Sequence, residues 1–151
     1  QEIENDLYFA FTAQEEVGLR GAGAAAFAVE PDIAVAVDVT DTGDLPERKT
    51  PMAVDMGRGP AVKVMDRSVI CTPEVCAALE RAAAACGIDV QREILQFGGT
   101  DTAALQKTRA GVQAGAVSIP TRYIHSPSEM CAVSDVEAAA RLLEKFVLQQ
   151  K

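Results

Sequence analysis

The feature that most constrains the fold is a regular alternation of short apolar runs with longer alanine-rich or amphipathic runs, separated by glycine and proline. Short apolar runs are typical of strands buried on both faces, and helical spacing between them is typical of a parallel sheet covered by helices. The expected strands are 7–13, 33–39, 61–65, 89–95 and 114–119, and the expected helices lie at 18–28, between Thr72 and Gly87, before Gly111 and from Ser134 onward. The sequence therefore predicts one α/β domain, with a mostly parallel sheet and helices on both faces.

Several local patterns refine this prediction. Lys63 interrupts an apolar run, which favours a strand near the edge of the sheet. Thr72 precedes Pro73 as an expected helix N-cap, and Ser134-x-x-Glu137 has the pattern of a capping box. The last helix is expected to present Val136, Leu142, Leu143, Phe146 and Val147 to the core, and the polar stretch 40–59, rich in glycine and proline, is expected to be a functional loop.

The composition excludes several classes of function. The net charge is −8 and the pI is near 4.6, whereas nucleic acids and anionic membranes select clustered Lys and Arg, so we expect neither as a partner. No apolar run approaches the roughly 18 residues of a membrane helix and no signal peptide is recognised, which makes the cytoplasm the default location. The four cysteines lack C-x-x-C spacing, so we expect reduced, mostly buried thiols.

Acidic side chains and the single histidine lie near the ends of the expected strands or just after them. These residues are Glu15, Glu16, Asp38, Asp101 and His125. Because ligands and catalytic groups collect at the carboxyl ends of strands in such sheets, we expect the five side chains to share one rim. Crowded carboxylates repel one another unless a cation holds them ionised, and a mixed histidine and carboxylate set suits zinc, cobalt or manganese better than calcium.

Each of these residues also has a purely structural interpretation. An acidic pair before a helix is favoured by the helix dipole, and a lone histidine is more often a hydrogen-bonded residue than a ligand. Asp38 fits a turn former at a strand end, and Asp101 fits a helix N-cap. From single residues, both interpretations stay open.

Five phrases in order resemble the M42 family of metallo-aminopeptidases, which are relatives of the glutamyl aminopeptidases. They are Phe-Thr-Ala-Gln-Glu-Glu-Val-Gly-Leu-Arg-Gly-Ala from Phe11, Val-Asp-Val-Thr from Val37, Gly-Arg-Gly-Pro from Gly57, Gly-Gly-Thr-Asp from Gly98 and Ser-Ile-Pro-Thr-Arg-Tyr-Ile-His-Ser ending at Ser126. The resemblance implies a zinc-peptidase-like three-layer sandwich, truncated at its N-terminus, in which residues 1–151 form the C-terminal part of the catalytic domain.

The resemblance also implies roles for individual residues. Glu15 would be the general base that deprotonates the attacking water, Glu16 and His125 would bind one metal ion, and Asp38 would bind the second. The two divalent ions would be zinc or cobalt, with manganese as an alternative. Gly99, Thr100 and Asp101 match a family block near the active site and are candidates for substrate binding.

The chain departs from the family pattern before Glu15. M42 enzymes also use an early His-x-Asp segment and a metal-bridging aspartate, whereas this chain has no histidine before His125. The complete enzyme would remove N-terminal residues from peptides in the cytoplasm and would form homo-oligomers, but the chain alone is expected to bind metal weakly and to lack peptidase activity. Two alternatives remain: a non-catalytic α/β fragment or assembly module, and a glucanase-like hydrolase on the same scaffold.

Overall fold

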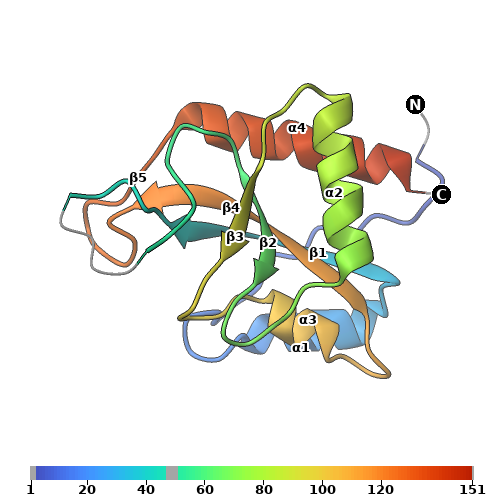
Figure 1. Ribbon diagram of the computed structural model, residues 1–151. Coiled ribbons are helices and arrows are strands. Elements are labelled where there is room, and N and C mark those ends of the chain that lie inside the picture. The colour runs from blue at the N-terminus through green and yellow to red at the C-terminus, as the bar shows by residue number, and fades with distance from the viewer. Residues whose placement is uncertain (1–2, 47–50, 151) are drawn as a thin grey trace.

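The computed structural model describes residues 3–46 and 51–150 and has three layers, with a sheet between two pairs of helices (Figure 1). Helices α2 and α4 cover one face of the sheet, and α1 and α3 cover the other. In chain order the elements are α1 (Arg20–Val29), β1 (Ile33–Asp41), β2 (Ala61–Met65), α2 (Pro73–Ala85), β3 (Gln91–Ile94), α3 (Thr102–Gln106), β4 (Gln113–Arg122), β5 (Met130–Cys131) and α4 (Val133–Gln149). The predicted α/β class is confirmed.

The sheet is mixed, with the strand order β1-β4-β2-β3 and with β5 paired to the end of β4. Strand β1 runs parallel to β4 over nine residue pairs, and β2 runs parallel to β3 over four. Strand β2 is antiparallel to β4 and meets it at only two pairs. Most paired residues are thus parallel, as predicted, and the carboxyl ends of β1 and β4 lie at the same edge of the sheet, beside β5 (Figure 1).

The main hydrophobic core lies between the sheet and the α2–α4 pair. Helix α2 approaches β4 so closely that a Cβ on Gly115 would lie 2.7 Å from Cγ1 of Val75, which explains the glycine in the strand. The buried members of the core are Val62, Val75, Leu79, Ala82, Ala83, Val117, Ala139, Leu142 and Phe146. The opposite face is covered by small side chains, with Ala22 and Ala26 of α1 and Ala103 of α3 buried.

The expected strand at 7–13 is wrong. This segment forms no ladder with the sheet and its side chains are exposed, with Phe9 80% and Phe11 99% accessible. A strand needs a neighbour to satisfy its backbone hydrogen bonds, and among the described residues no neighbouring strand pairs with it. The apolar composition that suggested a buried strand is present, but nothing in this part of the molecule covers it.

The expected edge position of the strand containing Lys63 is also wrong. Strand β2 lies between β4 and β3, and the Lys63 side chain is completely buried. Its ammonium group lies 2.5 Å from Oε1 of Glu93 and 3.5 Å from Oδ2 of Asp66. A buried lysine is tolerated in an interior strand when anionic partners compensate its charge, and these partners could not be identified from β2 alone.

The helix starts differ from the expected caps. Ser134 lies inside α4 and makes no cap hydrogen bond, because the N-cap position belongs to Ala132. Val136 is also not buried in the core, because it is 39% exposed. Thr72 is the residue before α2, as expected, but its hydroxyl accepts a hydrogen bond from the backbone N–H of Ala114 instead of capping the helix.

The remaining local expectations hold in part. The stretch after Asp41 contains no helix or strand up to Pro60 in the described residues, and 47–50 of the predicted loop lie outside them. All four cysteines are free thiols, as predicted, but only Cys71 is fully buried and Cys131 is exposed.

Candidate active site

A tight loop before α1 carries the two adjacent glutamates. The backbone N–H groups of Gly18 and Leu19 both donate to the carbonyl oxygen of Glu15, at 3.1 and 2.9 Å. The N–H of Gly21 donates to the carbonyl of Ala13 at 2.9 Å, and a Cβ on Gly21 would lie 2.4 Å from the Ala13 nitrogen. Only glycine fits there, so the sequence Glu-Glu-Val-Gly-Leu-Arg-Gly closes a compact loop that fixes the backbone of both glutamates.

The loop after β4 carries His125 in an uncommon backbone conformation. His125 and Tyr123 have φ values of 60° and 58°, in the left-handed region that non-glycine residues seldom adopt. The backbone N–H of His125 donates to Oε1 of Glu129 at 2.6 Å, which holds the loop in this form. Nε2 of His125 then lies 3.2 Å from Oε1 of Glu16, and both side chains are exposed.

A second contact anchors the start of this loop. Arg122, the last residue of β4, donates from Nε and Nη2 to the two carboxylate oxygens of Asp44, at 3.3 and 2.5 Å. This bidentate pair lowers the pKa of Asp44 to about 2. It ties the segment that follows β1 to the strand end that leads to His125.

Asp38 and Asp101 form the deeper part of the group. Asp38 is half-buried near the end of β1, and its Oδ1 accepts the backbone N–H of Val39 at 2.7 Å. Asp101 directly precedes α3, and its Oδ2 accepts the hydroxyl of Thr12 at 2.5 Å. The other oxygen of Asp101 is buried and has no hydrogen-bond partner within the described chain. It does not cap α3, so the interpretation as an N-cap does not hold.

The charges of these five residues influence one another. Burial is the largest cause that raises the pKa of Glu15, and the carboxylates of Asp38, Glu16 and Asp101 raise it further, while His125 opposes them. Burial also raises the pKa of Asp38, against the Val39 N–H and the Lys63 ammonium group. The five residues singled out in the sequence therefore lie close enough for their charges to act on one another, and Glu16 and His125 are in direct contact.

A family model described as M42 glutamyl aminopeptidase matches residues 1–142, which is nearly the whole chain. The chain belongs to the M42 family. It is 54% identical over 147 residues to the protein named "Putative aminopeptidase" from Acetivibrio thermocellus, covering 97% of this chain and 44% of that protein. This chain therefore spans less than half the length of this relative.

Solved structures give the same result. An aminopeptidase of the archaeon Desulfurococcus kamchatkensis is 37% identical, with a TM-score of 0.89 over 93% of this chain and 40% of that one. The TET1 peptidase of Pyrococcus horikoshii, which can assemble into a tetrahedron or a large octahedral shell, is 31% identical with a TM-score of 0.81, over 93% of this chain and 40% of that one.

The acidic group of this M42 chain does not form a closed metal site by itself. Within residues 3–46 and 51–150, no three His, Cys, Asp or Glu side chains are arranged so that they could hold a metal ion. Glu16 and His125 approach each other as a pair, and Asp38 is coupled to Glu16 by charge. The carboxylate crowding and the unpartnered oxygen of Asp101 suit a cation, but the number of converging donors is small.

The glycine-rich turn before α3 has fewer side chains free to contact a substrate than its sequence suggests. Thr100 is buried, and its hydroxyl donates to Oδ2 of Asp66 at 3.3 Å. A Cβ on Gly99 would lie 2.6 Å from Oγ of Ser68, so this turn packs directly against another turn. Any contact of Thr100 with a substrate would therefore come from its backbone.

Three residues around the M42 site were not identified from the sequence: Thr12, which bonds Asp101; Glu129, which holds His125; and the buried Lys63. A lysine within an apolar run was the one available signal, because a charge in a strand requires a partner wherever it is buried. Thr12 and Glu129 carry no such signal, since exposed loops often contain residues of these types.

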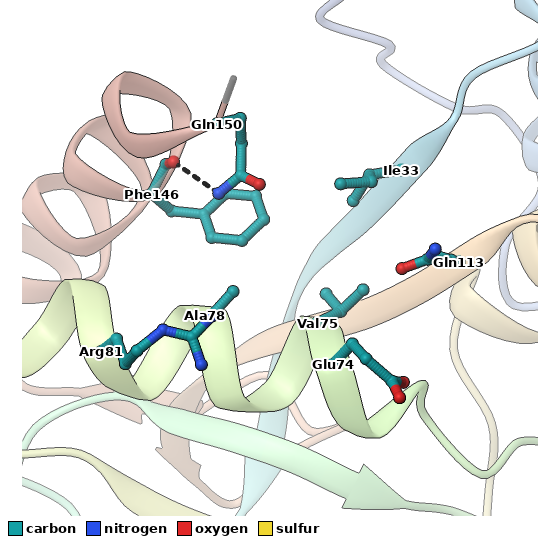
Figure 2. A pocket seen from close by; sticks show the side chains of 8 residues that line it. All are labelled: Ile33, Glu74, Val75, Ala78, Arg81, Gln113, Phe146 and Gln150. Atoms are coloured by element: carbon teal, nitrogen blue, oxygen red, sulfur yellow. Dashed lines mark hydrogen bonds between the residues drawn. The ribbon is translucent and has the colours of Figure 1, made fainter.

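A hollow of about 200 Å³ lies at the other end of the sheet, between α2 and α4 (Figure 2). Ile33 and Gln113, the first residues of β1 and β4, line it together with Val75 and Phe146. Asp38 and His125 lie near the opposite ends of β1 and β4, so the hollow is separate from the candidate active site. In the part of the chain that the structure describes, no helix has the length and apolar character needed to cross a membrane.

Proposed function

We propose that this chain is the C-terminal part of the catalytic domain of a metal-dependent aminopeptidase, which removes N-terminal residues from peptides. The observation that carries this proposal is the gathering of Glu15, Glu16, Asp38, Asp101 and His125 at one edge of the sheet, in a chain of the M42 family. In α/β sheets this edge is where catalytic groups collect.

Each residue has a distinct proposed role. Glu16 and His125, 3.2 Å apart, would hold one divalent ion, and Asp38 would hold a second. Zinc or cobalt, when bound, would supply positive charge that polarises the scissile carbonyl and lowers the pKa of water. Glu15 would take the proton from the attacking water, because the loop fixes its backbone beside the proposed ligand Glu16, and burial and the neighbouring carboxylates raise its pKa, which makes it a stronger base. Asp101 and the backbones of Gly99 and Thr100 would contact the substrate.

The chain would need further residues to complete this site. Metal sites in enzymes of this kind use at least three protein ligands for each ion, and this chain offers a pair and a single carboxylate. The matched relative is more than twice as long, so the remaining ligands would come from the rest of the protein. That part would also cover the exposed segment 7–11. Alone, the chain would bind metal weakly and would lack activity.

The test compares the full-length protein with its Glu15→Gln variant. Zinc- and cobalt-loaded protein is expected to release the N-terminal residue from short peptides, measured by chromatography of the products. Glu15→Gln is expected to reduce kcat by at least about 1,000-fold, because it removes the proton acceptor while preserving side-chain shape. Its metal content, measured by native mass spectrometry, is expected to equal that of the parent.

The controls separate the alternatives. Glu30→Gln changes an exposed carboxylate outside the site and is expected to leave activity unchanged. Loss of activity with a chelator and its recovery with metal would support the aminopeptidase, whereas hydrolysis of glucans that is insensitive to chelator would support a glucanase-like enzyme. A full-length protein that binds no metal and cleaves neither substrate would contradict the proposal and support a non-catalytic module.

We also propose that the full-length protein forms a homo-oligomer in the cytoplasm. The support is the assembly of the TET1 peptidase into closed shells, together with the shared fold. Most homo-oligomers have closed symmetry, so the expected masses are fixed multiples of one subunit. The same native mass spectra that report metal content would show this, and a single subunit mass would count against it.

A further inference from the structure

A buried ion cluster is linked by hydrogen bonds to the two segments that carry Asp38 and Asp101. Lys63 of β2 and Glu93 of β3 face each other in register on neighbouring parallel strands, with Nζ 2.5 Å from Oε1. Asp66, just after β2, completes the cluster 3.5 Å from the same ammonium group. All three side chains are at most 2% exposed, and none of them belongs to the machinery proposed above.

One arm of the cluster reaches the strand that carries Asp38. Oε1 of Glu93 also accepts the hydroxyl of Thr40, at 2.8 Å. Thr40 is fully buried and lies two residues after Asp38, on the same face of β1. Strands β4 and β2 separate β1 from β3 in the sheet, so this hydrogen bond links two strands that share no backbone ladder.

A second arm reaches the turn that carries Asp101. Oδ2 of Asp66 accepts the hydroxyl of Thr100, while Oδ1 accepts the backbone N–H and the hydroxyl of Ser68, both at 2.7 Å. Ser68 in turn packs against Gly99, where a Cβ would not fit. Asp66 therefore holds the two residues immediately before Asp101.

Stability alone does not account for this cluster. Burying an ion pair removes two charges from water, and apolar residues of similar volume often serve stability as well or better. One oxygen of Glu93 is, in addition, buried without a hydrogen-bond partner among the described residues. The cluster instead fixes the positions of two segments. Lys63 contacts both Glu93, which accepts a hydrogen bond from Thr40 at the end of β1, and Asp66, which accepts one from Thr100 in the turn before α3.

We propose that Lys63, Glu93 and Asp66 are positioning residues that hold the Asp38 and Asp101 segments at a fixed separation in the active site. This inference rests on the proposed function for its catalytic meaning, but the positioning itself can be measured separately. The residues touch neither substrate nor metal and act through Thr40 and Thr100.

The first test uses Lys63→Met combined with Glu93→Gln in the full-length protein. The double variant removes the charges of Lys63 and Glu93 at nearly constant volume but leaves Asp66 buried without its cation, so its thermal unfolding midpoint is expected to fall below that of the parent. Hydrogen–deuterium exchange is expected to increase in segments 38–42 and 98–102 and not elsewhere. We expect zinc affinity to fall about 10- to 100-fold, as for other residues that support metal ligands, and kcat to fall at least about tenfold with KM changed less than about threefold.

A matched pair at Thr40 tests one arm alone. Thr40→Val preserves shape and removes the hydroxyl, whereas Thr40→Ser preserves the hydroxyl. Thr40→Val is expected to raise exchange in 38–42 and to lower kcat, and Thr40→Ser is expected to restore both. The control is the ion pair between Glu80 of α2 and Arg92, which precedes Glu93 in β3. Glu80→Gln combined with Arg92→Met is expected to leave both kcat and the exchange in segments 38–42 and 98–102 unchanged.

The outcomes are distinguishable. Unchanged exchange in both segments, or a uniform increase over the whole chain, would overturn the positioning role. If the parent protein shows no peptidase activity with metal, the proposed function fails, and the exchange pattern still decides whether the cluster fixes the two segments. If the double variant does not fold, the comparison of Thr40→Val with Thr40→Ser decides, because both retain the ion cluster; equal exchange in the two would overturn the inference.

Discussion

At the scale of single residues, the contact between Asp44 and Arg122 shows how charge holds the loops of the site. Arg122 ends the strand before His125, and Asp44 belongs to the segment after β1. The guanidinium group donates to both carboxylate oxygens, and it keeps the pKa of Asp44 well below the usual value of 3.8. The pair therefore stabilises the folded state only while Asp44 is ionised.

This contact predicts a pH-dependent difference in stability. The folded pKa of about 2 lies below the unfolded value, so the stabilisation is present above about pH 4 and is lost as the pH falls toward 2. Asp44→Asn is expected to cost about 1 kcal/mol at pH 7, discounted for solvent exposure, and about nothing near pH 2. Urea unfolding of both proteins across this range measures the difference.

The control is Asp55→Asn, which affects the exposed pair of Asp55 and Arg58. It is expected to cost less than about 0.5 kcal/mol at any pH in the range. A cost of Asp44→Asn that persists unchanged at pH 2 would show that the carboxylate contributes by another route.

The candidate site residues could be singled out from the sequence, and their roles stay predictions, whereas the residues that hold them in place could not be singled out. Glu15, Asp38 and His125 lie near the ends of apolar runs or just after them, and that pattern is local in the sequence. The partners of the buried Lys63 are Glu93, 30 residues away on another strand, and Asp66, three residues away in the turn just after β2. A pattern in one strand carries no information about which side chain will lie opposite a charge, so Lys63 was misplaced at an edge.

At the scale of elements, the start of α4 shows why a capping pattern can mislead. Asp135, in the first turn of α4, is 1% exposed, and its carboxylate accepts the backbone N–H groups of Gly57 and Gly59 at 2.7 and 2.9 Å. The first turn of α4 is therefore held by the hydrogen bonds that Asp135 accepts from a loop distant in the sequence. The Ser134-x-x-Glu137 pattern is present in the sequence, but the helix starts two residues too early for it to act.

Two substitutions one residue apart test this assignment. Asp135→Ala leaves two N–H groups of the glycine loop without their acceptor and is expected to cost about 2–3 kcal/mol. Ser134→Ala removes no cap hydrogen bond and is expected to cost less than about 0.5 kcal/mol, whereas a working N-cap would cost about 1. Chemical unfolding of the two variants measures both values, and the reverse order would restore the capping box.

The elements themselves were well predicted where composition and period agree. Helices α2 and α4 and strands β1 and β4 appear close to their expected ranges, because their apolar residues pack within the described chain. Segment 7–13 failed although it has the composition of a strand, since a strand depends on a neighbour that sequence pattern cannot supply. Strand β5 has only two residues and gave no signal.

At the scale of the whole molecule, the most unusual surface is the aromatic segment 7–11, together with the open edge of β1. Phe9 and Phe11 are almost completely exposed, and Val37 of β1 is half exposed. Exposed apolar surface of this kind marks a region that another part of a protein covers, or one that promotes association.

The 151-residue chain in isolation is accordingly expected to self-associate and to bind a hydrophobic dye. Phe9→Ser with Phe11→Ser is expected to lower dye fluorescence several-fold and to shift sedimentation toward a single chain. The unfolding free energy is expected to change by less than about 0.5 kcal/mol, because these side chains are not buried. Ile70→Ser, at an exposed position elsewhere, is the control, and equal effects of the two changes would contradict a role for segment 7–11.

The pairing of β1 with β4 has a consequence for biosynthesis. Ile33 and Gln113 are neighbours in the sheet but lie 80 residues apart along the chain. At ribosomal speeds of about 5–20 residues per second, β1 is made roughly 4–16 s before its partner exists. During that interval its open edge is exposed together with the aromatic segment before it, so the nascent chain presents its most association-prone surface while it is still tethered. Chaperone binding at the ribosome would then protect this surface until β4 has been made.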